Sequence, residues 1–171
     1  MNHPEKMYNY NAWATQTLLG RIKELPSSVL QQEVNTSFPT IAEAFAHIYA
    51  IEKCWLQVLS GVSMPKALEA CLPLQQETLR YSVDEFVIAF NELAEQYKLW
   101  FQSQDDLEQT IELENPYAGT RSIQLAEIVL QVVNHGTYHR GNVSAMLRQL
   151  GHASTMNDYS LFWYQEPAKS I

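Results

Sequence analysis

Four long segments with apolar residues at helical spacing are the feature that most constrains how this chain can fold. The second segment begins with the capping-box pattern Thr40-x-x-Glu43 and is followed by Gly61, and the third begins with the same pattern at Ser82 and Glu85. Amphipathic segments of this length predict an all-α fold, a four-helix bundle. The four predicted helices span residues 4–24, 40–60, 82–102 and 125–149.

The connection between the second and third predicted helices, residues 61–81, is long and contains Pro65 and Pro73. A connection of this length permits a crossover, so we expect these two helices to be joined by a long linker and not by a tight antiparallel turn. The length of the chain suits one domain, and we take residues 1–171 as a single unit.

Two shorter stretches carry weaker signals. Residues 109–123 alternate weakly between polar and apolar side chains around an Asn-Pro pair and a glycine, which predicts a small hairpin-like loop. The tail, residues 158–167, is rich in aromatic residues. We expect it to pack back onto the helices through Leu161, Phe162 and Trp163.

The overall charge and the cysteine content exclude several classes of protein. The formal net charge of −8 disfavours a nucleic-acid partner, because an acidic surface repels phosphate. The two cysteines, Cys54 and Cys71, do not make a disulfide framework and fit a reducing compartment. The N-terminus lacks the layout of a signal peptide, and no window has the length and apolarity of a membrane span. We therefore expect a soluble cytoplasmic protein without a membrane or nucleic-acid partner.

Histidines at two places in the chain are the candidates for chemistry. His135 and His139 are four residues apart on the last predicted helix, so their rings stack on one face, and that face is expected to be buried. Two such histidines can chelate one ion or can be ordinary core residues satisfied by hydrogen bonds. His47, on the second predicted helix, also points inward and is the candidate for a third ligand. His3 and His152 are expected to be exposed.

Three runs of sequence resemble a known family. The run VVNHGTYHRGN, the isolated histidine in TIAEAFAHIYAIEKCW, and the opening YNYNAWATQTLL look like the DinB family of the DinB/YfiT superfamily of metal-binding helical proteins. The resemblance covers nearly the whole chain. It implies an up-down-down-up four-helix bundle with a long crossover between the second and third helices. It also implies a metal triad on His47, His135 and His139, and a homodimer.

The resemblance implies less about activity. Some related proteins are thiol-dependent transferases or isomerases that use bacillithiol, mycothiol or glutathione, and many have no established activity. Three neutral imidazoles leave a divalent ion its full charge and leave positions open for water or an anion. Zinc fits such a site best, and nickel, manganese or iron also accept imidazole. We therefore expect one divalent transition metal, with a low-molecular-weight thiol such as bacillithiol as a second cofactor and a small-molecule substrate.

The sequence leaves the type of function open. A metal-dependent thiol S-transferase, a hydrolase that uses metal-activated water, and a non-catalytic metal-binding or stress-response module all fit the three histidines. No general base or catalytic residue stands out. Among the neighbours, Glu43 and Asn142 are candidates to orient an imidazole, and Cys54 is expected to be a buried apolar residue. Arg140 is expected at the rim of the site or in an interface.

Overall fold

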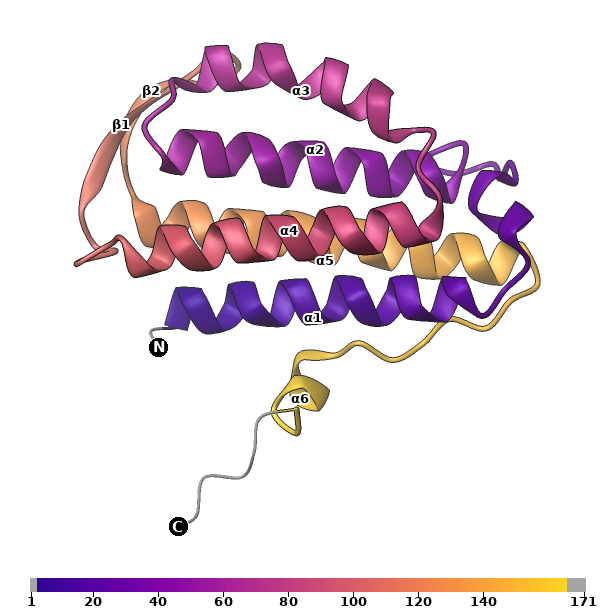
Figure 1. Cartoon of the computed structure of the whole chain (residues 1–171). Coiled ribbons are helices and arrows are strands. Elements are labelled where there is room, and N and C mark those ends of the chain that lie inside the picture. The colour runs from indigo at the N-terminus through magenta and orange to yellow at the C-terminus, as the bar shows by residue number, and fades with distance from the viewer. Residues whose placement is uncertain (1–2, 166–171) are drawn as a thin grey trace.

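The computed structural model describes residues 3–165 and is mostly helical, with one small two-stranded sheet (Figure 1). The prediction of a helical protein is confirmed, and the hairpin-like loop predicted at 109–123 is a true antiparallel hairpin. The elements, in chain order, are α1 (His3–Lys23), η1 (Ser27–Gln31), α2 (Ile41–Leu59), α3 (Met64–Thr78), α4 (Val83–Gln102), β1 (Thr110–Asn115), β2 (Gly119–Gln124), α5 (Leu125–Gln149) and α6 (Tyr159–Phe162).

The four predicted helices correspond to α1, α2, α4 and α5, and local capping explains where two of them begin. Ser82 and Glu85 form a complete capping box at the start of α4. At the start of α2, the Thr40 hydroxyl accepts a hydrogen bond of 3.2 Å from the backbone N–H of Glu43, which is half of the predicted box. These caps satisfy backbone N–H groups that have no partner within the helix.

The crossover is the main difference from the sequence-based expectation. Residues 61–81 were predicted as a long linker and assigned no helix, but they contain the helix α3, which lies along α2 as an outer layer (Figure 1). Pro65 falls in the first turn of α3, where its missing N–H costs nothing, although Pro73 lies inside the helix. The buried residues Met64, Ala67 and Cys71 recur at helical spacing and form the face that packs on α2.

The long helices contact one another in a layered arrangement. Helix α1 packs against α4 and α5, and α2 packs against α5, α4 and α3. In Figure 1, α1 and α5 run in one direction and α2 and α4 run in the other. The β1–β2 hairpin covers the end of the molecule where α4 ends and α5 begins. None of the helices described is long and apolar enough to cross a membrane.

The tail partly follows its prediction. Phe162 in α6 is buried against Tyr10 and Trp13 of α1, with ring centroids 6.0 and 5.7 Å away. Leu161 is half-buried, but Trp163 is 56% exposed, so its predicted packing is wrong. The last two residues of the predicted tail segment, 166 and 167, lie outside the described residues. The aromatic contact of α6 thus anchors the chain against α1.

Candidate metal centre

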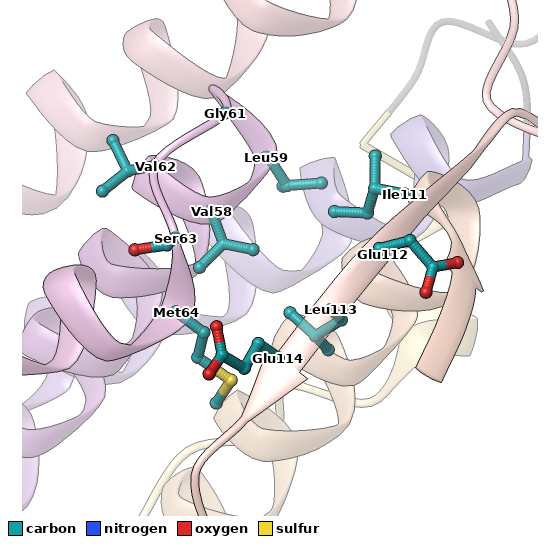
Figure 2. Close-up of a pocket in the computed structure, with 10 residues that line it drawn as sticks. All are labelled: Val58, Leu59, Gly61, Val62, Ser63, Met64, Ile111, Glu112, Leu113 and Glu114. Carbon is teal, nitrogen blue, oxygen red and sulfur yellow. The ribbon is translucent and has the colours of Figure 1, made fainter. Parts of the chain in front are cut away.

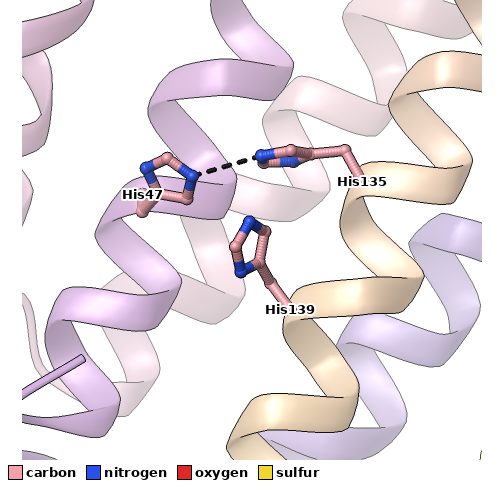
Figure 3. Close-up of side chains that lie close together, drawn as sticks. All are labelled: His47, His135 and His139. Atoms are coloured by element: carbon pink, nitrogen blue, oxygen red, sulfur yellow. Dashed lines mark hydrogen bonds between the residues drawn. The ribbon is translucent and has the colours of Figure 1, made fainter. Parts of the chain in front are cut away.

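His47, His135 and His139 come together between α2 and α5, as the sequence predicted (Figure 3). His135 and His139 lie one turn apart on α5 with their rings edge to face, and His47 faces them from α2. All three rings are half-buried. We refer to these three residues as the three-histidine cluster. His3 is exposed and His152 is half-buried, and neither belongs to the cluster.

The spacing of the ring nitrogens suits a single ion. One ligand atom from each histidine lies within 4.8 Å of the other two, and the Nε2 atoms of His47 and His135 are 3.1 Å apart. Two imidazole nitrogens bound to one tetrahedral zinc ion would be about 3.3 Å apart, given zinc–nitrogen distances of about 2.0–2.1 Å. Without an ion, 3.1 Å is also the length of a hydrogen bond in which one Nε2–H donates to the other ring. The donor set therefore fits a metal ion.

The environment keeps the three rings neutral. Burial lowers the pKa of His135 to about 3 and that of His139 to about 4, and repulsion from the neighbouring histidines adds to both shifts. The pKa of His47 is lowered mainly by burial, which a hydrogen bond with the Gln75 side chain opposes. A neutral imidazole is the form that binds metals, so at neutral pH no proton has to be displaced.

Several side chains orient and cover the rings. The Asn142 amide lies 3.3 Å from Nδ1 of His139, which confirms the predicted contact between these residues. Phe38, in the segment before α2, packs against both His47 and His139 with ring centroids 5.3 Å away. Tyr138 lies edge-on to His139 but is 65% exposed. Phe38 and Asn142 therefore restrict His139 from two sides.

Gln75 on α3 is a neighbour of the site that the sequence analysis missed. Its side chain bonds to the His47 ring, which places α3 beside the three-histidine cluster. The omission follows from the crossover, because a linker without a helix gives no face on which to place Gln75. Glu43, the other candidate for orienting a ring, takes part in the N-terminal cap of α2 through its backbone N–H.

Arg140 is the clearest correction. It was expected at the rim, but it is 2% exposed and lies in a polar network that joins all four long helices. Its guanidinium donates to Asn11 Oδ1, to Thr15 Oγ1 at 3.3 Å and to Thr137 Oγ1 at 3.0 Å. The buried polar network comprises Tyr8, Asn11 and Thr15 of α1, Glu52 of α2, Tyr97 of α4 and Arg140 of α5. The exposed Thr137 of α5 lies at its edge.

Glu52 is the acidic partner in the buried polar network. Its carboxylate is 4% exposed and accepts hydrogen bonds from the Tyr8 hydroxyl at 2.7 Å and the Asn11 amide at 3.2 Å. Its backbone carbonyl accepts a third bond, from the Tyr97 hydroxyl at 2.8 Å. Burial raises the pKa of Glu52, and the hydrogen bonds from Tyr8 and Asn11 and the charge of Arg140 act against that shift. The network fixes α2 relative to α5, and so fixes His47 relative to its two partners.

The cysteines do not contribute to the cluster. Cys54 and Cys71 are both free and buried, in a small apolar region between α2 and α3. Burial raises the pKa of Cys54 to about 11, which leaves it as a thiol at neutral pH. Within residues 3–165, no fourth His, Cys, Asp or Glu side chain joins the three histidines.

Two cavities lie near the hairpin. The hairpin cavity, of about 380 Å³, lies between the α2–α3 turn and β1, and Val58, Met64, Glu112 and Glu114 are among its lining residues (Figure 2). The groove cavity, of about 350 Å³, lies between α2, α5 and the hairpin, and it shares Leu113 with the hairpin cavity. The groove cavity is lined by Trp55, Leu113, Asn115, Ile123, Glu127, Ile128 and Gln131.

Fold and site together define a mostly helical protein with a three-histidine cluster that could hold a metal ion. The model of the DinB family matches residues 1–169. Protein DinB of Bacillus subtilis (strain 168) is 38% identical over 159 residues, which cover 93% of this chain and 92% of that protein. The chain belongs to the DinB family, as the sequence resemblance predicted.

A solved structure agrees with this assignment at the level of the fold. The crystal structure of a DinB-like protein from Bacillus cereus ATCC 10987 matches with a TM-score of 0.59. The match covers 86% of this chain and 89% of that one, at 19% sequence identity. A likeness at this identity concerns the path of the backbone and does not extend to activity.

Proposed function

We propose that this protein binds one divalent transition metal through His47, His135 and His139 and uses it for catalysis. The observation that carries the proposal is the convergence of three neutral imidazoles without a fourth protein ligand among residues 3–165. Structural zinc sites have four protein ligands, whereas catalytic sites have three and keep one position open. Zinc suits the donor set best, and nickel, manganese and iron are alternatives.

The chain's own residues have defined roles in this proposal. The three imidazoles hold the ion through neutral nitrogens, and Asn142 fixes the ring orientation of His139. Phe38 covers one side of His47 and His139 and excludes water there. An ion bound in this way would lower the pKa of a coordinated thiol or water and so supply a nucleophile at neutral pH.

We favour a thiol S-transferase that uses an added low-molecular-weight thiol, such as bacillithiol, over a hydrolase. The protein's own cysteines are unsuited to the attack, because Cys54 and Cys71 are buried and burial raises the pKa of each. Thiolate is a soft anionic ligand that suits zinc or nickel held by neutral groups. A metal-binding module without turnover is the alternative, and it would share the same three ligands.

The proposal includes the wider setting of the site. We infer that α1, α2, α4 and α5 form the up-down-down-up bundle that the family resemblance implies, with α3 as its crossover. We also propose a homodimer located in the cytoplasm. The antiparallel directions of the helices in Figure 1 support the bundle, and the acidic net charge of −8 disfavours nucleic acid.

The test combines metal analysis with activity. Purified protein is expected to contain about one divalent ion per chain, and His139→Ala to lose it, while His152→Ala serves as a control that removes a histidine outside the cluster. Metal-loaded protein is then incubated with a chloro-nitroaromatic electrophile and bacillithiol, glutathione or coenzyme A. Transfer that needs the thiol, vanishes in His139→Ala and persists without both cysteines supports the transferase. Ester or amide hydrolysis without a thiol would replace it with a hydrolase.

A further inference from the structure

The exposed side of α5 carries no charge over most of its length. The exposed residues of α5 between Glu127 and Arg148 are all neutral, and we call them the uncharged stripe: Leu130, Gln131, Asn134, Thr137, Tyr138, Gly141 and Ala145. At about 100° per residue they lie within an arc of about 120°, which runs beside the face that carries His135 and His139. The uncharged stripe is therefore a continuous surface along the outside of α5.

The composition of the stripe differs from that of a helix face turned to water. On α4 the exposed face is heavily charged, with Asp84, Glu85, Glu92, Glu95 and Lys98. Helix surfaces that face solvent normally carry such residues, whereas the core of a protein–protein interface is depleted of charge and enriched in tyrosine. The uncharged stripe has the second composition, and its two large side chains, Leu130 and Tyr138, are 44% and 65% exposed. These features indicate a surface that another protein covers.

Two opposite charges bound the uncharged stripe. Glu127 precedes it and Arg148 follows it, about 31 Å further along the helix. Both side chains are exposed, and neither forms a hydrogen bond or an ion pair with another residue in the part of the chain that the structure describes. The midpoint between them lies between Thr137 and Tyr138, at the centre of the stripe.

This order of charges matches a second copy of α5 that runs antiparallel to the first. Identical surfaces related by a two-fold axis contact each other reciprocally, so a residue before the axis faces one that lies equally far after it. With the axis at the midpoint of the stripe, Glu127 faces Arg148 of the partner subunit, and this ion pair forms twice. Leu130 then faces Ala145 of the partner subunit, which places a large side chain against a small one. A parallel pair would instead bring like charges together at both ends.

We propose that the uncharged stripe is the centre of a homodimer interface in which the two α5 helices pack antiparallel and Glu127 pairs with Arg148 of the partner subunit. This inference rests on the homodimer of the proposed function, and it names the surface and the register. The helices cross at a shallow angle of about 20°, because a steeper crossing would carry the paired charges at their ends out of reach. Tyr138 lies edge-on to His139, with ring centroids 4.9 Å apart, so the interface covers a ring beside the candidate metal centre.

The helix face alone is small for an interface. A surface about 31 Å long and about 10 Å wide has an area of about 300 Å², less than the roughly 800 Å² per partner of a standard interface. The chain that follows α5 lies along one edge of the stripe, because the Ser154 hydroxyl bonds to that of Ser144 at 2.9 Å. Met156, in the same segment, is 69% exposed. This segment adds to the interface beside the paired helices.

Charge reversal tests the antiparallel register. The dissociation constant of the dimer is measured by analytical ultracentrifugation over a range of protein concentrations. Glu127→Arg and Arg148→Glu are each expected to raise it roughly tenfold, because each removes two exposed ion pairs and puts like charges in their place. The double variant Glu127→Arg/Arg148→Glu restores both pairs with their signs exchanged, and its dissociation constant is expected to return to the wild-type value. The single variants change the net charge in opposite directions, so a general charge effect cannot weaken both.

Two further variants locate the interface. Glu69→Arg makes the same change in charge at an exposed position of α3 and is the matched control, which is expected to leave the dimer unchanged. Ala145→Glu places a carboxylate against Leu130 of the partner subunit, and it is expected to give monomers at concentrations where the wild type is dimeric. Every substituted side chain is exposed, so the variants are expected to keep the helix content of the wild type in far-UV circular dichroism.

The outcomes separate this inference from the proposed function. A wild-type dimer that neither the single charge reversals nor Ala145→Glu weakens would overturn this interface, while the homodimer itself still stood. A double variant no more dimeric than the single variants would overturn the antiparallel register. If the wild type remained a monomer at every concentration, the proposed homodimer would fail and this interface with it.

Discussion

Replacing Gly136 by alanine would place a methyl group where the buried polar network is tightest. Gly136 is buried in the interior of α5, next to His135. A Cβ at this position would overlap Asn11 Oδ1 and lie 2.8 Å from Arg140 Nη1. Both atoms belong to flexible side chains, but Asn11 is fully buried and Arg140 is 2% exposed, and the two are hydrogen-bonded to each other. Neither can withdraw without losing a partner.

The expected change in the free energy of unfolding is the sum of one stabilising and two destabilising contributions. Alanine in a helix interior is favoured over glycine by about 1 kcal/mol. Inserting a methyl group into a packed interior costs about 1–3 kcal/mol, and losing a buried hydrogen bond to a charged group costs about 1.5–3 kcal/mol. The two costs outweigh the gain, so we expect Gly136→Ala to destabilise the fold by about 2–4 kcal/mol.

A second glycine in the same helix supplies the control. Gly141 is exposed, and a Cβ there would have no atom within 4 Å. Gly141→Ala is therefore expected to stabilise the protein by about 0.5–1 kcal/mol, through helix propensity alone. The measurement is urea unfolding of both variants with a chelator present, so that bound metal does not contribute to the free energy of unfolding.

The sign of the change in the free energy of unfolding of Gly136→Ala tests the predicted overlap. If Gly136→Ala were as stable as Gly141→Ala, the close approach of α1 to α5 would not be real, and the position assigned to Arg140 would be wrong. If the variant were destabilised as expected, its metal affinity should fall as well, because the neighbouring His135 would shift with the backbone of α5.

Three further predictions concern the metal, pH and assembly. His135→Ala should lose stoichiometric metal binding and the rise in melting temperature that metal gives the wild type, measured by differential scanning fluorimetry with and without chelator; equal melting temperatures in the wild type would contradict tight binding. In the metal-free protein the pKa values of His47, His135 and His139 lie below the ordinary 6.5. As the pH falls below 6.5, the unfolded chain therefore takes up protons at these histidines before the folded protein does. Stability should fall as the pH drops from 6.5 toward about 4, the pKa of His139, and then 3, that of His135. Urea unfolding at several pH values measures this loss of stability, which should be smaller in His135→Gln. The same dependence of stability on pH in the variant and the wild type would contradict the lowered pKa of His135. Light scattering at micromolar concentration should give the mass of a homodimer, and a monomer mass would contradict that proposal.

The sequence was sufficient to predict which helix face each histidine of the cluster occupies, because that prediction depends only on neighbouring residues in the same helix. The spacing of four between His135 and His139 fixes their common face on any helix, and the apolar residues around His47 fix its direction. Asn142 follows from the same rule, since it lies three residues after His139. These features need no knowledge of how the helices pack, so periodicity indicated the face on which each lies, and the family resemblance implied that the three histidines form one triad.

The features that were missed depend on residues distant in the chain. Arg140 is buried because Asn11 and Thr15, 129 and 125 residues away in sequence, meet its guanidinium, and no local pattern marks such a partner. Gly136 was one available signal, because a glycine inside a helix often indicates close packing. Gly141 in the same helix carries the same signal but is exposed, so the pattern did not distinguish the two. Helix α3 was missed for a different reason, since its two prolines suggested a linker.

The two helices that carry the histidines are made at different times during synthesis. His47 and His135 are separated by 88 residues, and at about 5–20 residues per second the ribosome needs roughly 4–18 s to add them. A nascent chain that ends after α2 therefore presents only one imidazole of the three-histidine cluster, His47, which cannot chelate an ion by itself. Capture of the metal proposed for this site would therefore have to wait until α5 has emerged and docked, so that metal binding would follow folding of the chain.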